Sequence, residues 1–240
     1  ALRLYAHGAA TCAGAGIIVG VVTLTGLGLQ ISTIIVDMAG GNLIVTIIYT
    51  AIALWVIGLA VPVTGTYIIA VAICAPALIK LGVPDYAAHM FIFYYAVLAE
   101  VTPPTALNAF AAAALTGGDP YKTTMLSWKY TLPAFLVPFM FTSHPSGVGL
   151  LLKGSLTDMI LTNLTALIGV GVLAAGMSGG LVRRTVWVER VLLIAAGFIL
   201  VYPAPMADAV GVTLAAAVSI RQWLTRTPAV RNKEGIAIIP

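Results

Sequence analysis

Apolar segments follow one another along almost the whole chain, and this pattern limits the possible folds more than any other feature. Hydrophobic residues fill 60% of the 240 positions and charged residues only 8%, against roughly a quarter charged in an ordinary soluble domain. One globular core could not bury so much apolar surface, which excludes a soluble enzyme and a disordered chain. The sequence therefore predicts an all-α integral membrane protein, with at most about eight or nine crossings of about 20 residues each.

Glycine, proline, aspartate and asparagine divide the apolar sequence into separate segments. Two short pieces, 8–24 and 27–38, meet within Thr23–Gly28, and we expect them to form a re-entrant hairpin and its exit arm. Asp119 and Pro120 have the chemistry of a helix start, as N-cap and first helical residue. The membrane spans expected after the hairpin are 43–60, 66–81, 86–101, 124–141, 156–176, 186–202 and 206–224.

Basic residues predict how the last spans are oriented in the membrane. Lys122 and Lys129 precede the span 124–141, whereas Lys153 alone follows it. The remaining basic residues of this half are Arg183, Arg184, Arg190, Arg221, Arg226, Arg231 and Lys233. Because successive spans alternate sides, the basic clusters fall on one face, which we expect to be cytoplasmic together with the C-terminus. No basic run with interleaved aromatic residues is present, so nucleic acid is not an expected partner.

Three interruptions in the first half of the chain carry the functional signal: 20–28, 61–65 and 102–105. A helix break at mid-membrane is tolerated only inside protein or beside a wet cavity. Each break exposes carbonyl groups, which suit a hard cation such as Na⁺, and N–H groups, which suit a carboxylate. Prolines that merely kink packed helices are the structural alternative. Adjacent Pro103 and Pro104 remove two backbone N–H donors, which favours the broken helices of secondary transporters over a simple kink.

At these breaks the sequence resembles a known family. The matching segments, in order, are Gly16–Gly28, Gly58–Gly65, Thr102–Asn108 and Leu132–Phe139. They resemble the large permease subunit of the tripartite ATP-independent periplasmic (TRAP) transporters, and within it the fused permeases that work with TAXI-type binding proteins. The resemblance implies an elevator-type transporter with two inverted repeats, each with a re-entrant hairpin and discontinuous helices. This chain resembles the second repeat.

The resemblance also implies how the chain is organised and what it works with. The expected regions are 1–152 as the second transport repeat, 153–224 as C-terminal membrane helices and 225–240 as a cytoplasmic tail. The N-terminal half of the permease, with small-subunit-like helices, is an expected partner, and this chain alone should not transport. A periplasmic binding protein is expected to deliver a small, dicarboxylate-like organic anion. The expected location is the lipid bilayer of a bacterial or archaeal cytoplasmic (inner) membrane.

In such permeases a Na⁺ site is built largely of backbone carbonyls, and Na⁺ is the coupling ion. The corresponding positions here are Ile18, Gly20, Gly58 and Val61. The substrate and ion region comprises Pro62, Thr64, Gly65, Thr102, Pro103, Pro104, Thr105 and Asn108. The family usually has Pro-Thr-Thr-Ala where this chain has Pro62–Gly65, and a small apolar residue in place of Thr105. Both departures bear on the substrate rather than on the fold. No other metal and no organic cofactor is expected.

Glu100 is an acidic residue within two positions of the break at Thr102, where the family usually has an aspartate nearby. An acid inside the membrane is a candidate for binding a cation or relaying a proton. A carboxylate that caps a loop at the membrane edge explains it equally well. The sequence leaves both interpretations open, and with them the choice between Na⁺ and H⁺ coupling.

Enzyme activity is not expected. Gly176–Gly180 matches the G-x-S-x-G pattern, but that pattern needs a strand-to-helix elbow and a histidine base. Here it ends a membrane helix, and the last histidine in the chain is His144. No P-loop is present, which argues against ATP-driven transport. The predicted function is therefore import by alternating access; a passive channel and a structural membrane subunit without a site remain as alternatives.

Overall fold

A computed structural model describes residues 2–59, 61–181, 183, 185–225, 230–231 and 237–238. The first helices are α1 (Leu2–Leu24), α2 (Leu27–Met38), α3 (Leu43–Gly58), α4 (Val63–Lys80), α5 (Asp85–Ala99), α6 (Leu107–Thr116) and α7 (Pro120–Thr131). They are followed by η1 (Leu132–Leu136), α8 (Val137–Thr142), η2 (Pro145–Leu151), α9 (Leu156–Ser178), α10 (Trp187–Val201) and α11 (Pro205–Leu224). In the predicted tail, two short strands, β1 (Val230–Arg231) and β2 (Ala237–Ile238), pair antiparallel. The expected all-α membrane architecture is confirmed, apart from this small pairing.

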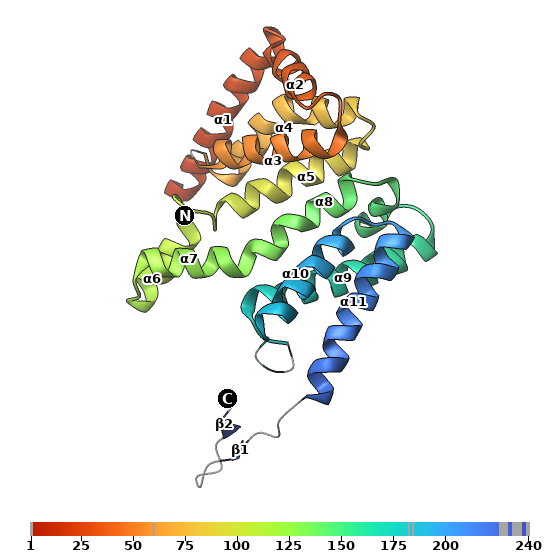
Figure 1. The fold of residues 1–240 in the computed structure, drawn as a ribbon. Helices are drawn as coiled ribbons and strands as arrows, with labels where there is room; N and C mark the ends of the chain where they lie inside the picture. Colours follow the sequence, from red (N-terminus) through yellow and green to blue (C-terminus); the bar gives the residue numbers. More distant parts are fainter. Residues whose placement is uncertain are drawn as a thin grey trace.

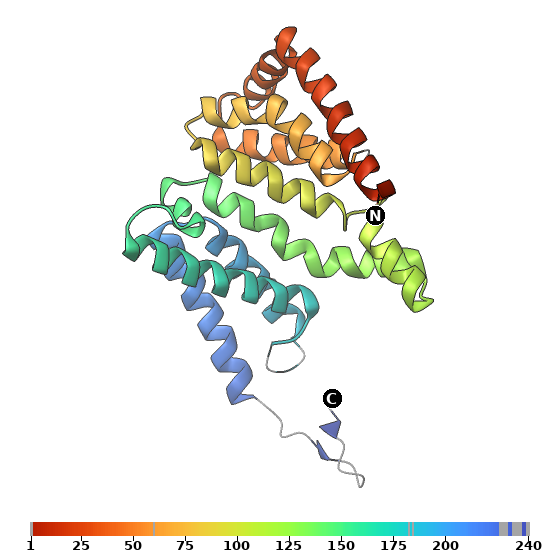
Figure 2. The same cartoon turned by 180° about the vertical axis from the view of Figure 1, so that it is seen from behind.

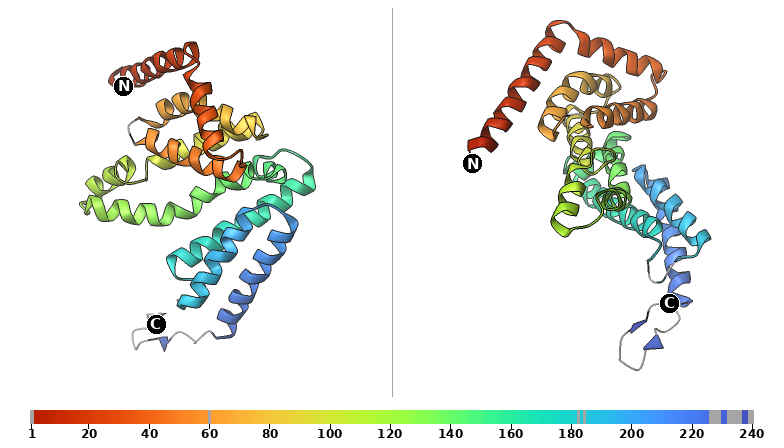
Figure 3. Two further views of the ribbon diagram at one scale, coloured as in Figure 1. Left: turned by 45° about the horizontal axis from the view of Figure 1, so that its top comes forward. Right: turned by 90° about the vertical axis from the view of Figure 1, so that its left-hand side faces the viewer.

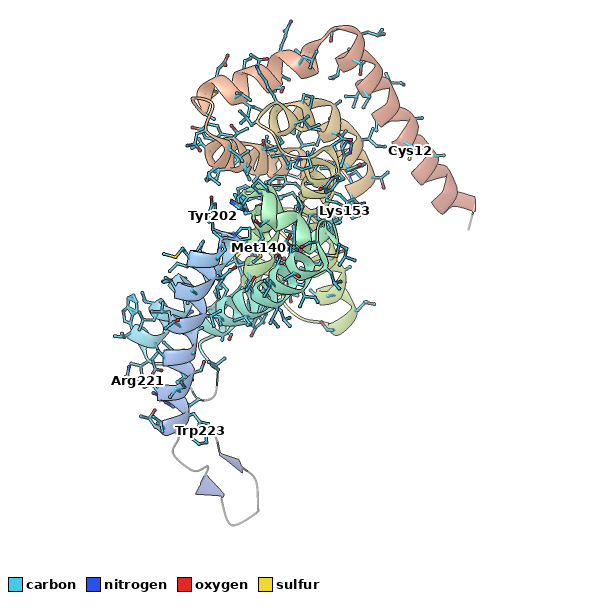
Figure 4. The ribbon with its side chains drawn as sticks, turned by 90° about the vertical axis from the view of Figure 1, so that its right-hand side faces the viewer. Cys12, Met140, Lys153, Tyr202, Arg221 and Trp223 are labelled. Atoms are coloured by element: carbon cyan, nitrogen blue, oxygen red, sulfur yellow. The ribbon has the colours of Figure 1, made fainter. Side chains whose placement is uncertain are left out.

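The helices form two groups, which the rod of α7, η1 and α8 joins (Figures 1 and 2). In the first group α3, α4 and α5 enclose an apolar core in which Leu54, Leu78 and Phe91 are fully buried. In the second group α9, α10 and α11 pack around Leu193 and Ala196. Met140 of α8 is buried where the two groups meet (Figure 4).

Two of the described helices, α4 and α9, are individually long and apolar enough to cross a bilayer. A third span is possible if α1, from Cys12, and α2 are taken together. This is fewer than the sequence predicted. Helices such as α3 and α6 are apolar but too short, and α11 is 20 residues long but not apolar enough. The span expected at 124–141 is divided: Pro133 and Pro138 supply no N–H donor, and the segment becomes α7, η1 and α8 in succession.

The two helix breaks predicted around 61–65 and 102–105 are present. Helix α3 ends at Gly58 and α4 begins at Val63, so the break lies slightly earlier in the chain than expected. The second break separates the end of α5 at Ala99 from the start of α6 at Leu107. The helix start expected at 119–120 is also confirmed, since the Asp119 carboxylate accepts a hydrogen bond from the Lys122 backbone N–H at 2.8 Å.

Helices α1 and α2 meet at an angle of 73°, a geometry that suits either a broken span or a re-entrant loop. The two arms diverge rather than lie against each other, and both pack on α4 (Figure 3). The contact between α2 and α4 is very close at Gly28: a methyl group added there would lie 2.3 Å from the carbonyl oxygen of Ala72. Glycine is therefore required at this crossing.

A buried carboxylate joins the ends of the second helical group. Glu189, at the start of α10, is fully buried and forms an ion pair of 2.7 Å with Arg183. It also accepts hydrogen bonds from the Gln222 side chain at 2.9 Å and from the backbone N–H of Val186 at 3.2 Å. Arg221, near the end of α11 (Figure 4), lies 3.8 Å from the same carboxylate. This network links α10 to α11 at a site far from the helix breaks.

Candidate functional site

The two helix breaks face each other across a cavity of about 290 Å³. Each residue that lines it lies at or beside the end of a helix. These residues are Gly58, Leu59, Val61, Pro62, Ala99, Glu100, Thr105 and Leu107. The cavity therefore forms where α3 ends, α4 begins, α5 ends and α6 begins.

Helix ends of both polarities meet at this cavity. The C-terminal ends of α3 and α5 carry partial negative charge, and the N-terminal ends of α4 and α6 carry partial positive charge. Glu100 adds a carboxylate on the side of the α5 end. A cation is stabilised near the C-terminal ends and the acid, whereas an anion is stabilised near the N-terminal ends.

Hydroxyl groups hold the two breaks in shape. The Thr66 hydroxyl donates to the Val61 carbonyl at 2.7 Å, and the Thr66 backbone N–H donates to the Pro62 carbonyl at 2.9 Å. At the other break, the buried Thr102 hydroxyl donates to the carbonyl of Leu98 at 2.7 Å. Thr66 did not stand out in the sequence, although a hydroxyl residue one turn after a proline break is a recognisable signal for such a bond.

The two helix N-termini differ in how much of their hydrogen-bonding capacity is used. Neither α4 nor α6 has a side-chain hydrogen bond to its first turn, as far as the described residues show. In α6 the backbone N–H of Asn108 donates to the Glu100 carbonyl at 3.3 Å, which ties the break together. Among the described residues, the N–H groups of Val63, Thr64 and Gly65 in the first turn of α4 donate no such bond to the residues of their own break. The α4 end is therefore the better place for an anion.

The structure brings together five of the site residues predicted from the sequence. Gly58, Val61, Pro62, Glu100 and Thr105 all line the cavity between the breaks. They come from both breaks, so residues about 40 positions apart in the sequence share one site. The residue pattern alone indicated the two breaks separately, whereas the resemblance implied that both belong to one substrate and ion region.

The other predicted site residues lie around the cavity or away from it. Ile18 and Gly20 are within the continuous helix α1 and do not line it. Thr64 and Gly65 are in the first turn of α4, Thr102 is buried in the second break, and Asn108 is exposed on α6. Pro103 and Pro104 line a separate, neighbouring cavity.

This neighbouring cavity has a volume of about 540 Å³ and lies between the end of α3, the second break, α6 and α7. Its lining includes the aromatic side chains of Trp55, Phe110, Tyr121 and Trp128. Sequence reasoning missed it. A signal was present in α7, where Tyr121, Thr124, Met125 and Trp128 have the i, i+3, i+4, i+7 spacing of one helix face.

Close packing at Gly58 gives a prediction about the stability of the fold that does not depend on ion binding. A methyl group added at Gly58 would lie 2.5 Å from the Cβ atom of Ala99, so Gly58→Ala should lower stability by about 2 kcal/mol through overpacking. Combining it with Ala99→Gly removes the clash, since the Ala99 Cα atom is 4.0 Å from the added methyl. Thermal unfolding in detergent should therefore show a lower Tm for Gly58→Ala and recovery in the double variant. An equal loss in both would contradict this packing.

Comparison with known proteins places the chain in a family. Residues 2–146 match the family described as DctM, the DctM component of the tripartite ATP-independent periplasmic transporters. The match includes both helix breaks and the cavity between them, and it ends before α9. No curated protein and no solved structure matched the chain. Since the family match covers more than half of the sequence, this chain belongs to the DctM family, the large permease component of the TRAP transporters.

Proposed function

We propose that this chain is the second repeat of a permease that imports a small organic anion by Na⁺-coupled alternating access. Family membership implies a multi-pass inner-membrane transport protein that works with a periplasmic binding protein. The observation that carries the finer proposal is the cavity where helix ends of opposite polarity meet beside Glu100. A TAXI-type binding protein, an N-terminal half with a hairpin of its own and a cytoplasmic C-terminus complete the proposal.

In this mechanism backbone carbonyls at the first break hold the cation. Gly58 and Val61 line the cavity, and although the Val61 carbonyl already accepts from Thr66, a carbonyl oxygen has a second lone pair. Glu100 supplies a negative charge on the opposite wall. Ile18 and Gly20, in the adjoining arm α1, would join the site only as the hairpin moves toward the cavity. The substrate carboxylate then binds at the N-terminal end of α4, near Thr64.

Uptake into proteoliposomes tests the proposal directly. The complete permease and its binding protein are reconstituted, labelled organic acids are supplied, and a Na⁺ gradient is imposed or omitted. We expect uptake that requires both the gradient and the binding protein. Glu100→Gln should weaken Na⁺ dependence about tenfold, as expected for a loss of roughly 1.4 kcal/mol of ion binding. Asp37→Asn, a matched change at an exposed acid on α2, should leave it unchanged.

Other outcomes would contradict specific parts of this proposal. Flux that ignores both the gradient and the binding protein would refute coupled transport and indicate a channel. Uptake driven only by a proton gradient and abolished in Glu100→Gln would refute Na⁺ coupling and make Glu100 the proton carrier. Full Na⁺ dependence in Glu100→Gln would refute a role of Glu100 in ion binding and indicate that its carboxylate only caps a loop.

A further inference from the structure

The 540 Å³ cavity beside the ion and anion site has the size and lining of a small-molecule pocket. Ligand pockets typically measure about 300–1,000 Å³ and are lined by apolar and aromatic side chains with a few polar groups. Trp55, Phe110 and Trp128 supply three aromatic walls from three different helices. A pocket of this composition favours a flat or branched apolar group over a second carboxylate, because its apolar lining cannot replace the hydrogen bonds that water gives to a charge.

One polar group in this cavity has no partner. Thr124 is only 2% exposed, and its hydroxyl forms no hydrogen bond with any described residue. A buried hydroxyl left unpaired costs free energy, roughly 1–3 kcal/mol. Several threonine hydroxyls in the described helices are satisfied by a carbonyl one turn earlier, as in Thr123 of the same helix. Among the polar groups of this lining, the Thr124 hydroxyl would therefore gain most from a hydrogen-bond partner on a bound molecule.

The large and small cavities are neighbours. Leu59 lines both of them, and the consecutive residues Pro104 and Thr105 line one each. A molecule that spans Leu59 would place one end at the α4 N-terminus and the other among the aromatic side chains. We propose that the transported anion is a monocarboxylate whose aromatic or branched apolar body occupies the aromatic cavity. This inference rests on the proposed function. This substrate class differs from the dicarboxylate-like anion expected from the sequence.

Equilibrium binding to the purified complete permease tests the substrate class. Titration calorimetry in detergent and saturating Na⁺ compares three probes: 3-phenylpropionate, 3-(4-hydroxyphenyl)propionate and succinate. The phenyl probe should bind at least about tenfold more tightly than succinate. Trp128→Ala should weaken its binding about tenfold through the loss of aromatic contact. Trp187→Ala, a matched change at a tryptophan 71% exposed on α10, should have no effect.

Thr124→Val keeps the shape of the side chain and so tests the pocket without risk to the fold. The parent should prefer the hydroxylated probe by about tenfold, the effect of one hydrogen bond, and this preference should vanish in Thr124→Val. Equal binding of succinate and the phenyl probe, or no effect of either cavity variant, would overturn the inference. This binding measurement uses no gradient and no binding protein. It therefore still tests the substrate class if coupled transport is not observed. Na⁺-driven uptake of succinate without binding of the phenyl probe would refute the inference alone.

Discussion

Replacing Gly28 with alanine should detach α2 from α4 and lower the stability of the protein by about 3 kcal/mol. The added methyl group would lie 2.3 Å from the backbone oxygen of Ala72 and 3.2 Å from the Val22 side chain. A backbone atom cannot move aside as a side chain can, so the two helices must separate. Thermal unfolding in detergent, followed by tryptophan fluorescence, measures the loss.

A glycine in the preceding helix provides the matched control. A methyl group added at Gly16 meets no atom within 4 Å, so Gly16→Ala should leave the Tm unchanged or raise it slightly, because alanine is the better helix former. A side-chain substitution elsewhere should not rescue Gly28→Ala, in contrast to the pair Gly58 and Ala99. Equal Tm values for Gly28→Ala and Gly16→Ala would show that α2 does not pack against α4 in this way.

The second large effect is expected at Glu189, in the other helical group. Glu189→Ala removes the partner of Arg183 and the acceptor of the Gln222 amide. We expect a loss of about 3 kcal/mol, because water compensates the remaining arginine charge only in part and the buried hydrogen bond from Gln222 is lost. We therefore expect a clear fall in Tm, measured in detergent as above, with α10 and α11 released from each other at this end.

The burial of the Glu189 side chain determines the size of this effect, and an exposed acid provides the control. Arg183 is 26% exposed and Arg221 60% exposed, whereas the Glu189 carboxylate has no contact with solvent. Most of the cost therefore comes from the hydrogen bonds that the buried carboxylate accepts from Gln222 and Val186. Asp37→Ala removes an exposed acid and should change the Tm little. A similar Tm for the two variants would mean that the network is merely a surface feature.

Local chemistry explains what the sequence predicted well. Proline lacks an N–H group and restricts the residue before it, so breaks near Pro62 and Pro103 could be placed within a few residues. The helix start at Asp119 and Pro120 followed from capping rules. The same effect was underestimated at Pro133 and Pro138. There the long apolar run predicted one continuous span, whereas the structure has a 3-10 helix, η1, between α7 and α8.

Features that depend on tertiary packing could not be predicted. Nothing in the sequence around Gly58 or Ala99 shows that these residues touch, because their contact depends on how α3 and α5 cross. Similarly, the unpaired hydroxyl of Thr124 is recognisable only once the cavity around it is known. Ile18 and Gly20, to which the resemblance gives a role in ion binding, lie in an intact helix outside the cavity, and that role stays a prediction.

The meeting of helix ends at the small cavity also has a thermodynamic consequence. A cation near the α3 and α5 ends and a carboxylate near the α4 end would each lower the electrostatic free energy of the other. Linkage then requires that the ion increase substrate affinity by the same factor by which the substrate increases ion affinity. Either ligand alone would leave one polarity of the site uncompensated, whereas together they form a neutral pair. Cooperative loading would therefore follow from the attraction between the two ligands, which the opposite helix ends hold close together.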